Sequence, residues 1–536
     1  MMESSLLGEL VQKSAERTPQ ATALTYAGAH LNYAALQTQV EQFASALVHT
    51  GVARAERVGI YLEKCPQTVV ASFGAAAAGC VFVPINPLLK PDQVAFILRD
   101  CNVRLLVTSA ARFALLKDAL RACTDLRHVV LTDAHAADEV AHTNSHLTVT
   151  PWSAWMQCAP GRAHRVIDTD MAAILYTSGS SGQPKGVVLS HRNMVAGAKS
   201  VASYLENSAH DTLLAALPLS FDAGFSQLTT AFHVGARVVL LNYLLPRDLL
   251  RTLEHEGVTG LTAVPPLYIQ LAQFEWPRAI GAKLRYFANT GGRMPRETLS
   301  VLRAQVPRAK PFLMYGLTEA FRSTYLPPEE VDRRPDSIGK AIPNAEILVL
   351  REDGSACEPD EPGELVHRGA LVGMGYWNDT AKTAERYKIL PSDASAQASG
   401  LPLPEYAVFS GDTVRKDEEG FLYFIGRRDE MMKTSGYRVS PTEVEEVLYA
   451  TKLVGECVAF GVEHPTLGHA IRVIATPAPQ VGAIDADTLL GVCRQRMPTY
   501  MVPTSIDVVS APLPRNPNGK LDRKLLSSQW MQAHAA

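Results

Sequence analysis

A loop rich in glycine and serine, with a single lysine, occupies residues 176–189, YTSGSSGQPKGVVL. Its glycines, Gly179, Gly182 and Gly186, allow successive backbone N–H groups to converge on an anion. Lys185 adds a mobile positive charge, and further donors come from the hydroxyls of Thr177, Ser178, Ser180 and Ser181. This combination favours a polyphosphate ligand; a surface hairpin with an incidental lysine is the alternative.

The spacing of this loop excludes two common phosphate-binding loops. A Walker A loop requires GxxxxGK[ST], whereas Gly179, Gly182 and Lys185 form GxxGxxK followed by glycine. A dinucleotide-binding loop requires GxGxxG at the start of a helix, and that pattern is not found here. The loop instead lies between two apolar β-branched runs, which predicts a tight connection between strands. Ser190 is then placed to cap the helix that follows.

Length and composition limit the class of protein. A chain of 536 residues is too long for one hydrophobic core, so at least two domains are expected. A net charge of −3 provides no overall basic field for nucleic acid. The eight cysteines are scattered without metal-binding or CxxC spacing, which is typical of reduced thiols in the cytoplasm. The N-terminus has no signal-peptide pattern, and the most apolar window, 69–85, predicts a buried helix followed by a strand rather than membrane insertion.

Alternation of short apolar runs with helical stretches indicates an α/β fold up to about residue 265. The predicted strands are 58–62, 103–109, 128–133, 172–177, 212–219 and 237–242. From Ser337 onwards, period-two strands and tight turns predict a β-rich subdomain. Residues 134–165 and 391–404 are expected to be irregular, and the last ~110 residues are expected to form a small α+β domain.

Six motifs in consistent order carry a family resemblance across nearly the whole chain. The loop YTSGSSGQPKGV resembles the phosphate loop of the AMP-forming adenylating superfamily, which includes acyl-CoA synthetases, adenylation domains of nonribosomal peptide synthetases and luciferases. Ser181 stands where threonine is usual, and the hydroxyl is kept. The other matches are LNYAALQ (31–37), YGLTE (315–319), GELVHRGALVGMGYW (363–377), SGDTV (410–414), GRRDEMMKTSGYRVSPTEVE (426–445) and PRNPNGKLDRK (514–524). Several segments also resemble bacterial acyl-CoA ligases of exosortase-associated clusters and stand-alone amino-acid adenylation enzymes.

The resemblance implies a two-step reaction and a two-part architecture. A carboxylate attacks the α-phosphorus of ATP to give acyl-AMP and pyrophosphate, and a thiol then displaces AMP to give a thioester. Residues 1–427 would form the AMP-binding domain, with the β-rich subdomain at about 337–427. Residues 428–536 would form a mobile cap with its hinge at Asp429.

The resemblance also implies roles for individual residues. Lys520 would bridge the carboxylate and the α-phosphate, and Glu319 would contact Mg²⁺. Asp412 would accept the ribose hydroxyls. Lys433 and Gly436 would reach the thiol tunnel after the cap has moved. The remaining nucleotide contacts would be Thr318 at the α-phosphate, Tyr315 and Gly316 at the adenine, Gly291, Gly292 and Arg293 on the adenine side, and Arg427 at the ribose or phosphate.

The acid pocket is less sharply defined. Phe221-Asp222 resembles the element of amino-acid-activating domains in which the aspartate pairs with the substrate ammonium. Asp222 could equally cap a helix or pair with a protein lysine. Alignment with those domains adds Ala223, Ser226, Thr290, Met314, Arg322 and Ser323 to the pocket wall. Arg322 could bind a second carboxylate or support Glu319.

The expected cofactors are ATP, Mg²⁺, and CoA or a phosphopantetheine thiol. The acid is either a small amino acid or a simple carboxylic acid. The chain ends soon after Lys524, so a carrier protein would be a separate partner. We also considered a luciferase-like oxygenase and a non-catalytic nucleotide-binding protein. The joint presence of Lys185, Glu319, Asp412 and Lys520 disfavours the latter.

Overall fold

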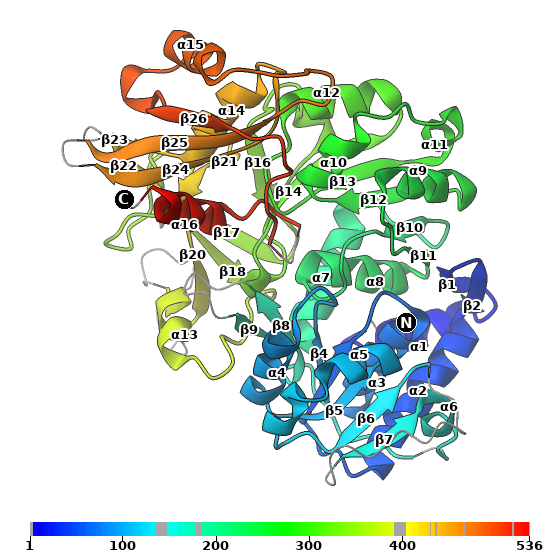
Figure 1. Ribbon diagram of the computed structural model, residues 1–536. Coiled ribbons are helices and arrows are strands. Elements are labelled where there is room, and N and C mark those ends of the chain that lie inside the picture. The colour runs from blue at the N-terminus through cyan, green and yellow to red at the C-terminus, as the bar shows by residue number, and fades with distance from the viewer. Residues whose placement is uncertain are drawn as a thin grey trace.

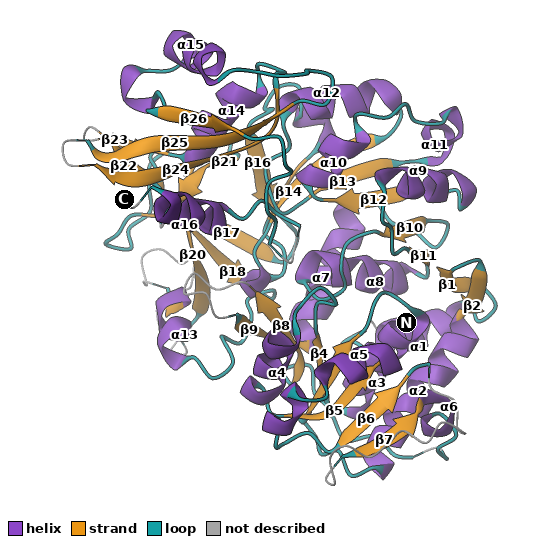
Figure 2. Ribbon diagram, in the orientation of Figure 1, coloured by secondary structure: helices purple, strands orange, loops and turns teal. Residues whose placement is uncertain are grey.

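The computed structural model describes residues 4–133, 147–159, 161–177, 184–390, 404–428, 430–434, 437–464, 467–516 and 519–534. It confirms the expected mixed α/β class (Figures 1 and 2). Within these ranges, every helix is too short or too polar to traverse a bilayer.

A seven-stranded sheet in the described residues occupies the N-terminal part of the molecule, at the bottom of Figure 1. Its strand order is β7-β6-β5-β3-β4-β8-β9. All neighbours are parallel except β8 and β9, which form an antiparallel pair. The strands are β3 (Arg57–Tyr61), β4 (Val81–Pro84), β5 (Val103–Thr108), β6 (His128–Leu131), β7 (Thr148–Pro151), β8 (Met171–Thr177) and β9 (Lys185–Ser190).

A larger sheet, of fourteen strands within the described residues, forms the centre of the molecule. It runs β17-β18-β20-β21-β16-β15-β14-β13-β12-β10-β11-β1-β2, and β19 pairs with β20. The strands from β10 to β14 are parallel, and the antiparallel strand β15 joins them to β16 and the β-rich part. The strands are β1 (Thr22–Tyr26), β2 (Ala29–Asn32), β10 (Thr212–Ala215), β11 (Arg237–Leu240), β12 (Gly260–Ala263), β13 (Tyr286–Asn289), β14 (Lys310–Tyr315), β15 (Thr324–Leu326), β16 (Ser337–Ala341), β17 (Ala345–Leu350), β18 (Gly363–Gly369), β19 (Tyr387–Ile389), β20 (Tyr406–Lys416) and β21 (Leu422–Arg427).

A third sheet lies in the C-terminal lobe, by which we mean residues 430–534. It contains β22 (Met432–Thr434), β23 (Tyr437–Val439), β24 (Val454–His464), β25 (Gly468–Pro477) and β26 (Ser505–Val508). The lobe also contains α14 (Pro441–Tyr449), α15 (Ala486–Arg496) and α16 (Arg523–Ala533). It has its own apolar core, which includes Val444, Leu489 and Val473.

Helices cover both large sheets, and the longest core cluster lies between them. α7 packs against α8, and both contribute to one buried cluster with α2 and α3. α7 begins where the sequence predicts, because the Ser190 hydroxyl accepts the backbone N–H of Asn193. The other helices are α1 (Glu9–Arg17), α2 (Tyr33–His49), α3 (Pro66–Ala78), α4 (Pro91–Asp100), α5 (Ala110–Leu116), α6 (Trp152–Trp155), α7 (His191–Tyr204), α8 (Asp222–Val234), α9 (Pro246–His255), α10 (Pro265–Leu271), α11 (Arg278–Lys283), α12 (Arg296–Gln305) and α13 (Thr380–Arg386).

Two of the sequence expectations about irregular segments have different outcomes. The segment 134–165 is wrong as an irregular stretch over 148–155, where β7 and α6 form because the apolar faces of Val149 and Trp155 pack onto the sheet edge. Residues 391–403 lie outside the described residues. The predicted helix followed by a strand at 69–85 is confirmed as α3 and β4.

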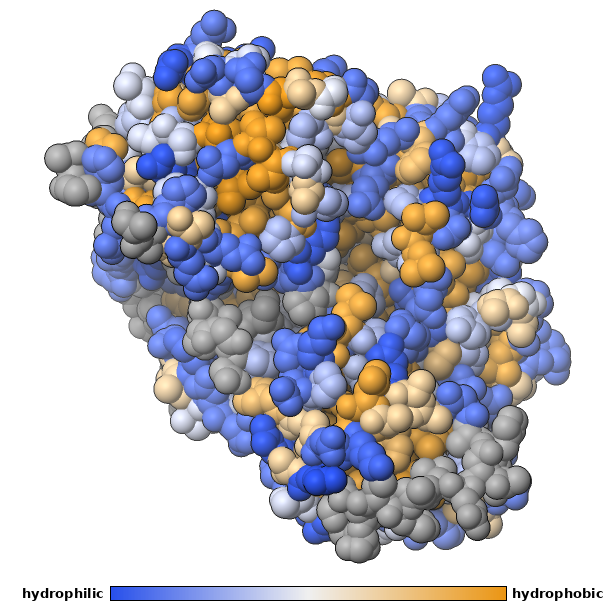
Figure 3. Space-filling model, in the orientation of Figure 1, coloured by the Kyte–Doolittle hydropathy of each residue, from blue (hydrophilic) through white to orange (hydrophobic). Residues whose placement is uncertain are grey.

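Ion pairs connect the C-terminal lobe to α12 and the loop before it. Glu446 pairs with Arg293, and Lys452 Nζ lies 2.8 Å from Glu297. Figure 3 shows polar side chains around the rim of this face, and a hollow between the C-terminal lobe and the rest of the molecule. The lobe is therefore held in one orientation by contacts that solvent can reach.

Candidate active site

The carboxyl ends of three adjacent parallel strands meet on one side of the large sheet. β12 ends at Ala263, β13 at Asn289 and β14 at Tyr315. Ligands of open α/β sheets bind beyond such ends, because the backbone leaves the sheet there and forms loops. The loops at 290–293 and 315–319 contain residues that the sequence assigned to the nucleotide.

The predicted phosphate loop closes an antiparallel hairpin, as expected. Thr177 at the end of β8 pairs directly with Lys185 at the start of β9. Ser178, Gly179, Ser180, Ser181 and Gly182 lie outside the described residues. Lys185 Nζ lies 5.6 Å from the centroid of the Tyr376 ring. Burial, with a contribution from Lys382, lowers the pKa of Lys185 below its ordinary value.

Glu319 lies beside the root of this hairpin. The Tyr376 hydroxyl donates to Glu319 Oε1 at 2.5 Å, so one aromatic residue contacts both the lysine and the carboxylate. Our sequence assignments gave Tyr376 no role, although it lies in the GYW segment of a quoted motif. Among the described residues, no group of three or more His, Cys, Asp or Glu side chains could hold a metal. A Mg²⁺ ion at Glu319 would therefore need phosphate oxygens and water as its other ligands, which is the usual arrangement for magnesium.

A turn with unusual backbone geometry separates Glu319 from Arg322. Phe321 has φ +57°, a left-handed value that is strained for a residue with a side chain. Its ring packs against α7 where Gly197 has no side chain: a Cβ there would lie 2.2 Å from the ring. The packing of Phe321 thus fixes the point at which the chain passes from Glu319 to the buried Arg322.

Asp412 is largely buried, with one oxygen bonded and one unsatisfied. The Tyr315 hydroxyl donates to Oδ2 at 2.5 Å. Oδ1 has no hydrogen-bond partner and lies 3.8 Å from Arg427 Nε. Burial raises the pKa of Asp412, while Arg427 and the Tyr315 hydroxyl lower it. The sequence assigned both oxygens to ribose, but the structure leaves only Oδ1 without a partner.

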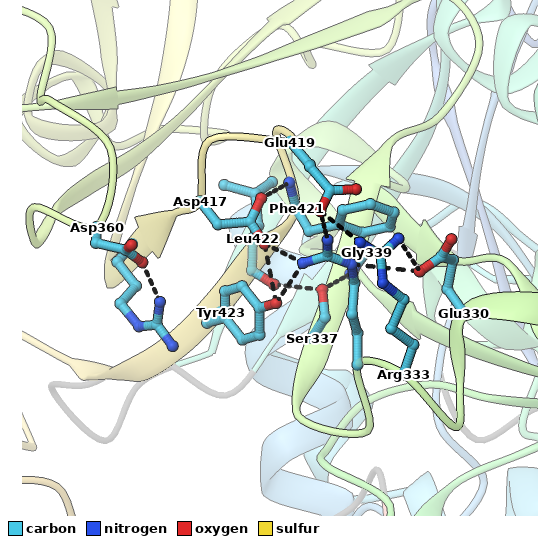
Figure 4. A network of polar contacts seen from close by, with 12 residues as sticks. Glu330, Arg333, Ser337, Gly339, Asp360, Asp417, Glu419, Phe421, Leu422 and Tyr423 are labelled. Atoms are coloured by element: carbon cyan, nitrogen blue, oxygen red, sulfur yellow. Dashed lines mark hydrogen bonds and ion pairs between the residues drawn. The ribbon is translucent and has the colours of Figure 1, made fainter.

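The opposite end of the hairpin that carries Asp412 is fixed by a charged network (Figure 4). Arg334 is nearly buried and pairs with Asp417, and its Nη1 donates to the Tyr423 hydroxyl at 2.9 Å. Register then pairs Asp412 with Arg427 across β20 and β21. These contacts hold the two strands, and hence the two charged residues, at a fixed separation.

Lys520 enters the site from the C-terminal lobe. A Cβ placed on Gly291 would lie 3.1 Å from Lys520 Cε and 3.7 Å from Nζ. The side chain is open to solvent, yet the protein on both sides of the cleft lowers the pKa of its ammonium by desolvation. Asp222 raises that pKa, and Asp412 raises it less. Lys520 therefore lies between the predicted acid pocket and the predicted ribose carboxylate.

The predicted acid pocket contains a buried ion pair. Arg322 Nη1 donates to Asp222 Oδ2 at 2.9 Å, and the two side chains are 2% and 12% exposed. Asp222 is the first residue of α8 rather than its N-cap, which is Phe221. Of the open alternatives for Asp222, the structure therefore shows a protein cation, with arginine in place of the expected lysine.

A small cavity of about 20 Å³ lies next to this pair. Ala223, Ser226, Met314 and Arg322 line it, as the sequence predicts for the acid pocket. The other lining residues are Val201, Leu205, Leu213, Leu214, Gln227, Thr230, Gly260, Thr262 and Tyr286. Thr290 and Ser323 are buried but do not line the cavity. The Ser323 hydroxyl instead lies 2.9 Å from Nδ1 of the buried His367.

The remaining predicted residues are placed as follows. Arg293 pairs with Asp336 and Glu446, so it contributes to the contact between lobes. Gly292, Gly316 and Thr318 lie in the loops after β13 and β14, and Lys433 lies in β22. Asp429 and Gly436 lie outside the described residues. Arg386 of α13 was not predicted; its guanidinium lies against Gly411, next to Asp412.

Comparison with known proteins gives consistent matches over the whole chain. Residues 11–377 match the family described as AMP-binding enzyme, and residues 443–520 match the AMP-binding enzyme C-terminal domain. The chain is 30% identical to an L-proline–[L-prolyl-carrier protein] ligase of Pseudomonas fluorescens, covering 98% of this chain and 99% of that one. It is 28% identical to a linear gramicidin synthase of Brevibacillus parabrevis over 98% of its length, but spans only 10% of that protein. The structure of O-succinylbenzoate CoA synthetase from Bacillus subtilis with ATP and magnesium superposes with TM-score 0.80 at 25% identity, covering 97% of this chain and 99% of that one.

Proposed function

The chain belongs to the AMP-binding enzyme family, and from that premise we propose that it is an ATP-dependent acid–thiol ligase. It joins a small carboxylic or amino acid to AMP, releases pyrophosphate, and then transfers the acyl group to a thiol. The observation that carries the proposal is the position of Lys520, with its ammonium close to Gly291 at a strand end and in the fields of Asp222 and Asp412. A cation in that position can compensate a carboxylate and an α-phosphate together.

The nucleotide side uses residues already gathered at the strand ends. Lys185, held over the Tyr376 ring, faces the terminal phosphates, and Glu319 supplies the single carboxylate that magnesium needs beside phosphate oxygens. Magnesium bound there supplies charge neutralisation of the triphosphate. Asp412 Oδ1, buried and without a partner, accepts a ribose hydroxyl.

In the first half-reaction, an oxygen of the acid carboxylate forms a bond to the α-phosphorus as the bond to pyrophosphate breaks. Both reactants are anions, so positioning and charge compensation by Lys520 replace acid–base catalysis. In the second half-reaction, a thiolate sulfur bonds to the acyl carbon and AMP leaves. For that step residues 428–536 turn about Asp429, Lys520 withdraws, and the region of Lys433 and Gly436 approaches the thiol.

The acceptor is CoA or the phosphopantetheine arm of a separate carrier protein. The L-proline relative acts on a carrier protein, and the match covers nearly the full length of both chains. We place the reaction in the cytoplasm, where ATP and reduced thiols are available and where the eight free cysteines would remain reduced.

Pyrophosphate exchange into ATP, measured over a panel of carboxylic and amino acids, tests the first half-reaction. Exchange with at least one acid is expected, and a Lys520→Ala variant should lack it while still binding ATP. Thioester formation on CoA or on a phosphopantetheinylated carrier protein then identifies the acceptor. Absence of exchange with every acid in a folded, ATP-binding protein would overturn the proposal.

A further inference from the structure

The Asp222–Arg322 pair alters the charge that the acid pocket presents. In most surroundings a buried carboxylate requires a cation, and a substrate ammonium could provide one. Here Arg322 already provides it, at 2.9 Å and 2% exposure, through a hydrogen bond from Nη1. Lys520 adds a second positive charge close to Asp222. A substrate ammonium would therefore be the third cation around a single carboxylate.

The polar atoms around the cavity indicate what is missing from it. Arg322 Nε and Gln227 Oε1 are both buried, both residues line the cavity, and neither atom has a hydrogen-bond partner. Gln227 Nε2 donates to the Gly224 carbonyl at 3.2 Å, which leaves Oε1 as the free acceptor. Buried donors and acceptors are almost always satisfied, so a group from outside the chain is expected to meet them. A volume of about 20 Å³ accommodates one group the size of water or a hydroxyl.

The charges can be summed over the groups that face the bound acid. Asp222 contributes −1, and Arg322 and Lys520 contribute +1 each, so the pocket has a net charge of +1. Of the residues that line the cavity, Arg322 alone carries a full charge. A zwitterionic amino acid such as alanine brings no net charge and leaves the buried excess uncompensated. An acid of net charge −1 neutralises it.

Accepting the ligase function proposed above, we propose that the substrate is a small acid that enters with net charge −1. Besides the reacting carboxylate it carries an oxygen that accepts the Arg322 Nε–H. Two chemical sources satisfy this requirement. A hydroxy acid has no ammonium and uses its hydroxyl, whereas an acidic amino acid places its ammonium at Asp222 and its second carboxylate at Arg322.

Two pairs of nearly isosteric acids test the assignment in the pyrophosphate exchange assay. Lactate and L-alanine differ in a hydroxyl against an ammonium, and L-aspartate and L-asparagine differ in a carboxylate against a carboxamide. The member with charge −1 is expected to have at least a tenfold higher kcat/KM in the pair that the enzyme activates, which also identifies the source. Higher values for alanine or asparagine would overturn the charge assignment and leave the ligase function intact. No exchange with any acid would instead overturn the ligase function.

Variants of the pair change the pocket charge in known steps. Arg322→Gln lowers it to zero and should reverse the preference towards the neutral member. The double variant Asp222→Asn/Arg322→Gln restores +1 and should restore the original preference, without leaving a buried carboxylate unpaired. Asp222→Asn alone raises the charge to +2 and should favour malate, with charge −2, over lactate. Arg303→Gln, at an exposed ion pair on α12, is the matched control and should leave every ratio unchanged.

An unchanged preference in folded Arg322→Gln would overturn the proposal, as would loss of the original preference in the double variant. Thermal melting establishes that each variant is folded. If Arg322→Gln does not fold, the malate-to-lactate ratio of Asp222→Asn decides the matter, and an unshifted ratio would overturn the proposal.

Discussion

Replacement of Gly291 by alanine should separate the two half-reactions. Gly291 has φ +76°, and its new methyl group would lie 3.1 Å from Lys520 Cε and 3.3 Å from Val264 Cγ1. The end of a lysine side chain can yield, so the contact should displace the ammonium by a few tenths of an ångström rather than unfold the protein. Lys520 would then be misplaced in the conformation that forms the adenylate.

The magnitude follows from backbone strain and from misplacement. A left-handed backbone costs alanine about 1 kcal/mol in free energy of unfolding relative to glycine. Gly28 is a matched control, because its φ is +80° and nothing lies within 4 Å of its Cβ position. Both variants should lose about the same stability. Because a 1 Å misplacement of reacting groups can cost about a hundredfold, we expect roughly a tenfold loss of adenylation in Gly291→Ala only.

Two assays distinguish the half-reactions. Pyrophosphate exchange should fall in Gly291→Ala and stay at the wild-type rate in Gly28→Ala. Thioester formation from supplied acyl-AMP should be similar in both variants, because Lys520 is withdrawn at that stage. Equal exchange rates in the two variants would refute the placement of Lys520, and an equal loss in both half-reactions would refute its withdrawal.

Three further predictions concern single contacts of the site. Lys520→Ala should lower pyrophosphate exchange about a thousandfold and leave ATP binding intact, as calorimetry would show; undiminished exchange would contradict its role. Tyr315→Phe removes a donor that lowers the pKa of Asp412, which burial already raises. Because the ionised carboxylate binds ribose, ATP affinity should be lost as the pH falls through that pKa, and the loss should begin at higher pH in the variant than in the wild type; coincident curves in a calorimetric pH titration would exclude this role. Glu446→Gln breaks the half-exposed pair with Arg293 and should slow adenylation a few-fold but not thioester formation, which stopped-flow measurement of each step would check.

The fold was largely predictable because its signals are local. Six apolar β-branched runs became strands of the two large sheets, and the capping serine at 190 starts α7 as predicted. Local patterns could not reveal that β15 connects the parallel strands to the β-rich part, because pairing between distant segments depends on tertiary packing. Nor did composition separate the short strand β7 from its irregular surroundings.

In the candidate site, residue identities were predictable and their partners were not. The motifs identify Glu319, Asp412 and Lys520, but no pattern in a single sequence places Tyr376 on Glu319 or Tyr315 on Asp412. Asp222 shows the limit most clearly, because its partner lies 100 residues away in the chain. Whether that partner is substrate or protein changes the expected substrate charge.

The continuity of the large sheet has a consequence for how the protein opens. β12, β13 and β14, which bring the acid-pocket loops, and β20, which carries Asp412, belong to one hydrogen-bonded ladder. Amide hydrogens along that ladder should exchange with deuterium as a single slow cooperative unit, whereas those of the C-terminal lobe should exchange independently. Partial unfolding would therefore release the lysine-bearing lobe first and leave both halves of the nucleotide and acid platform in register.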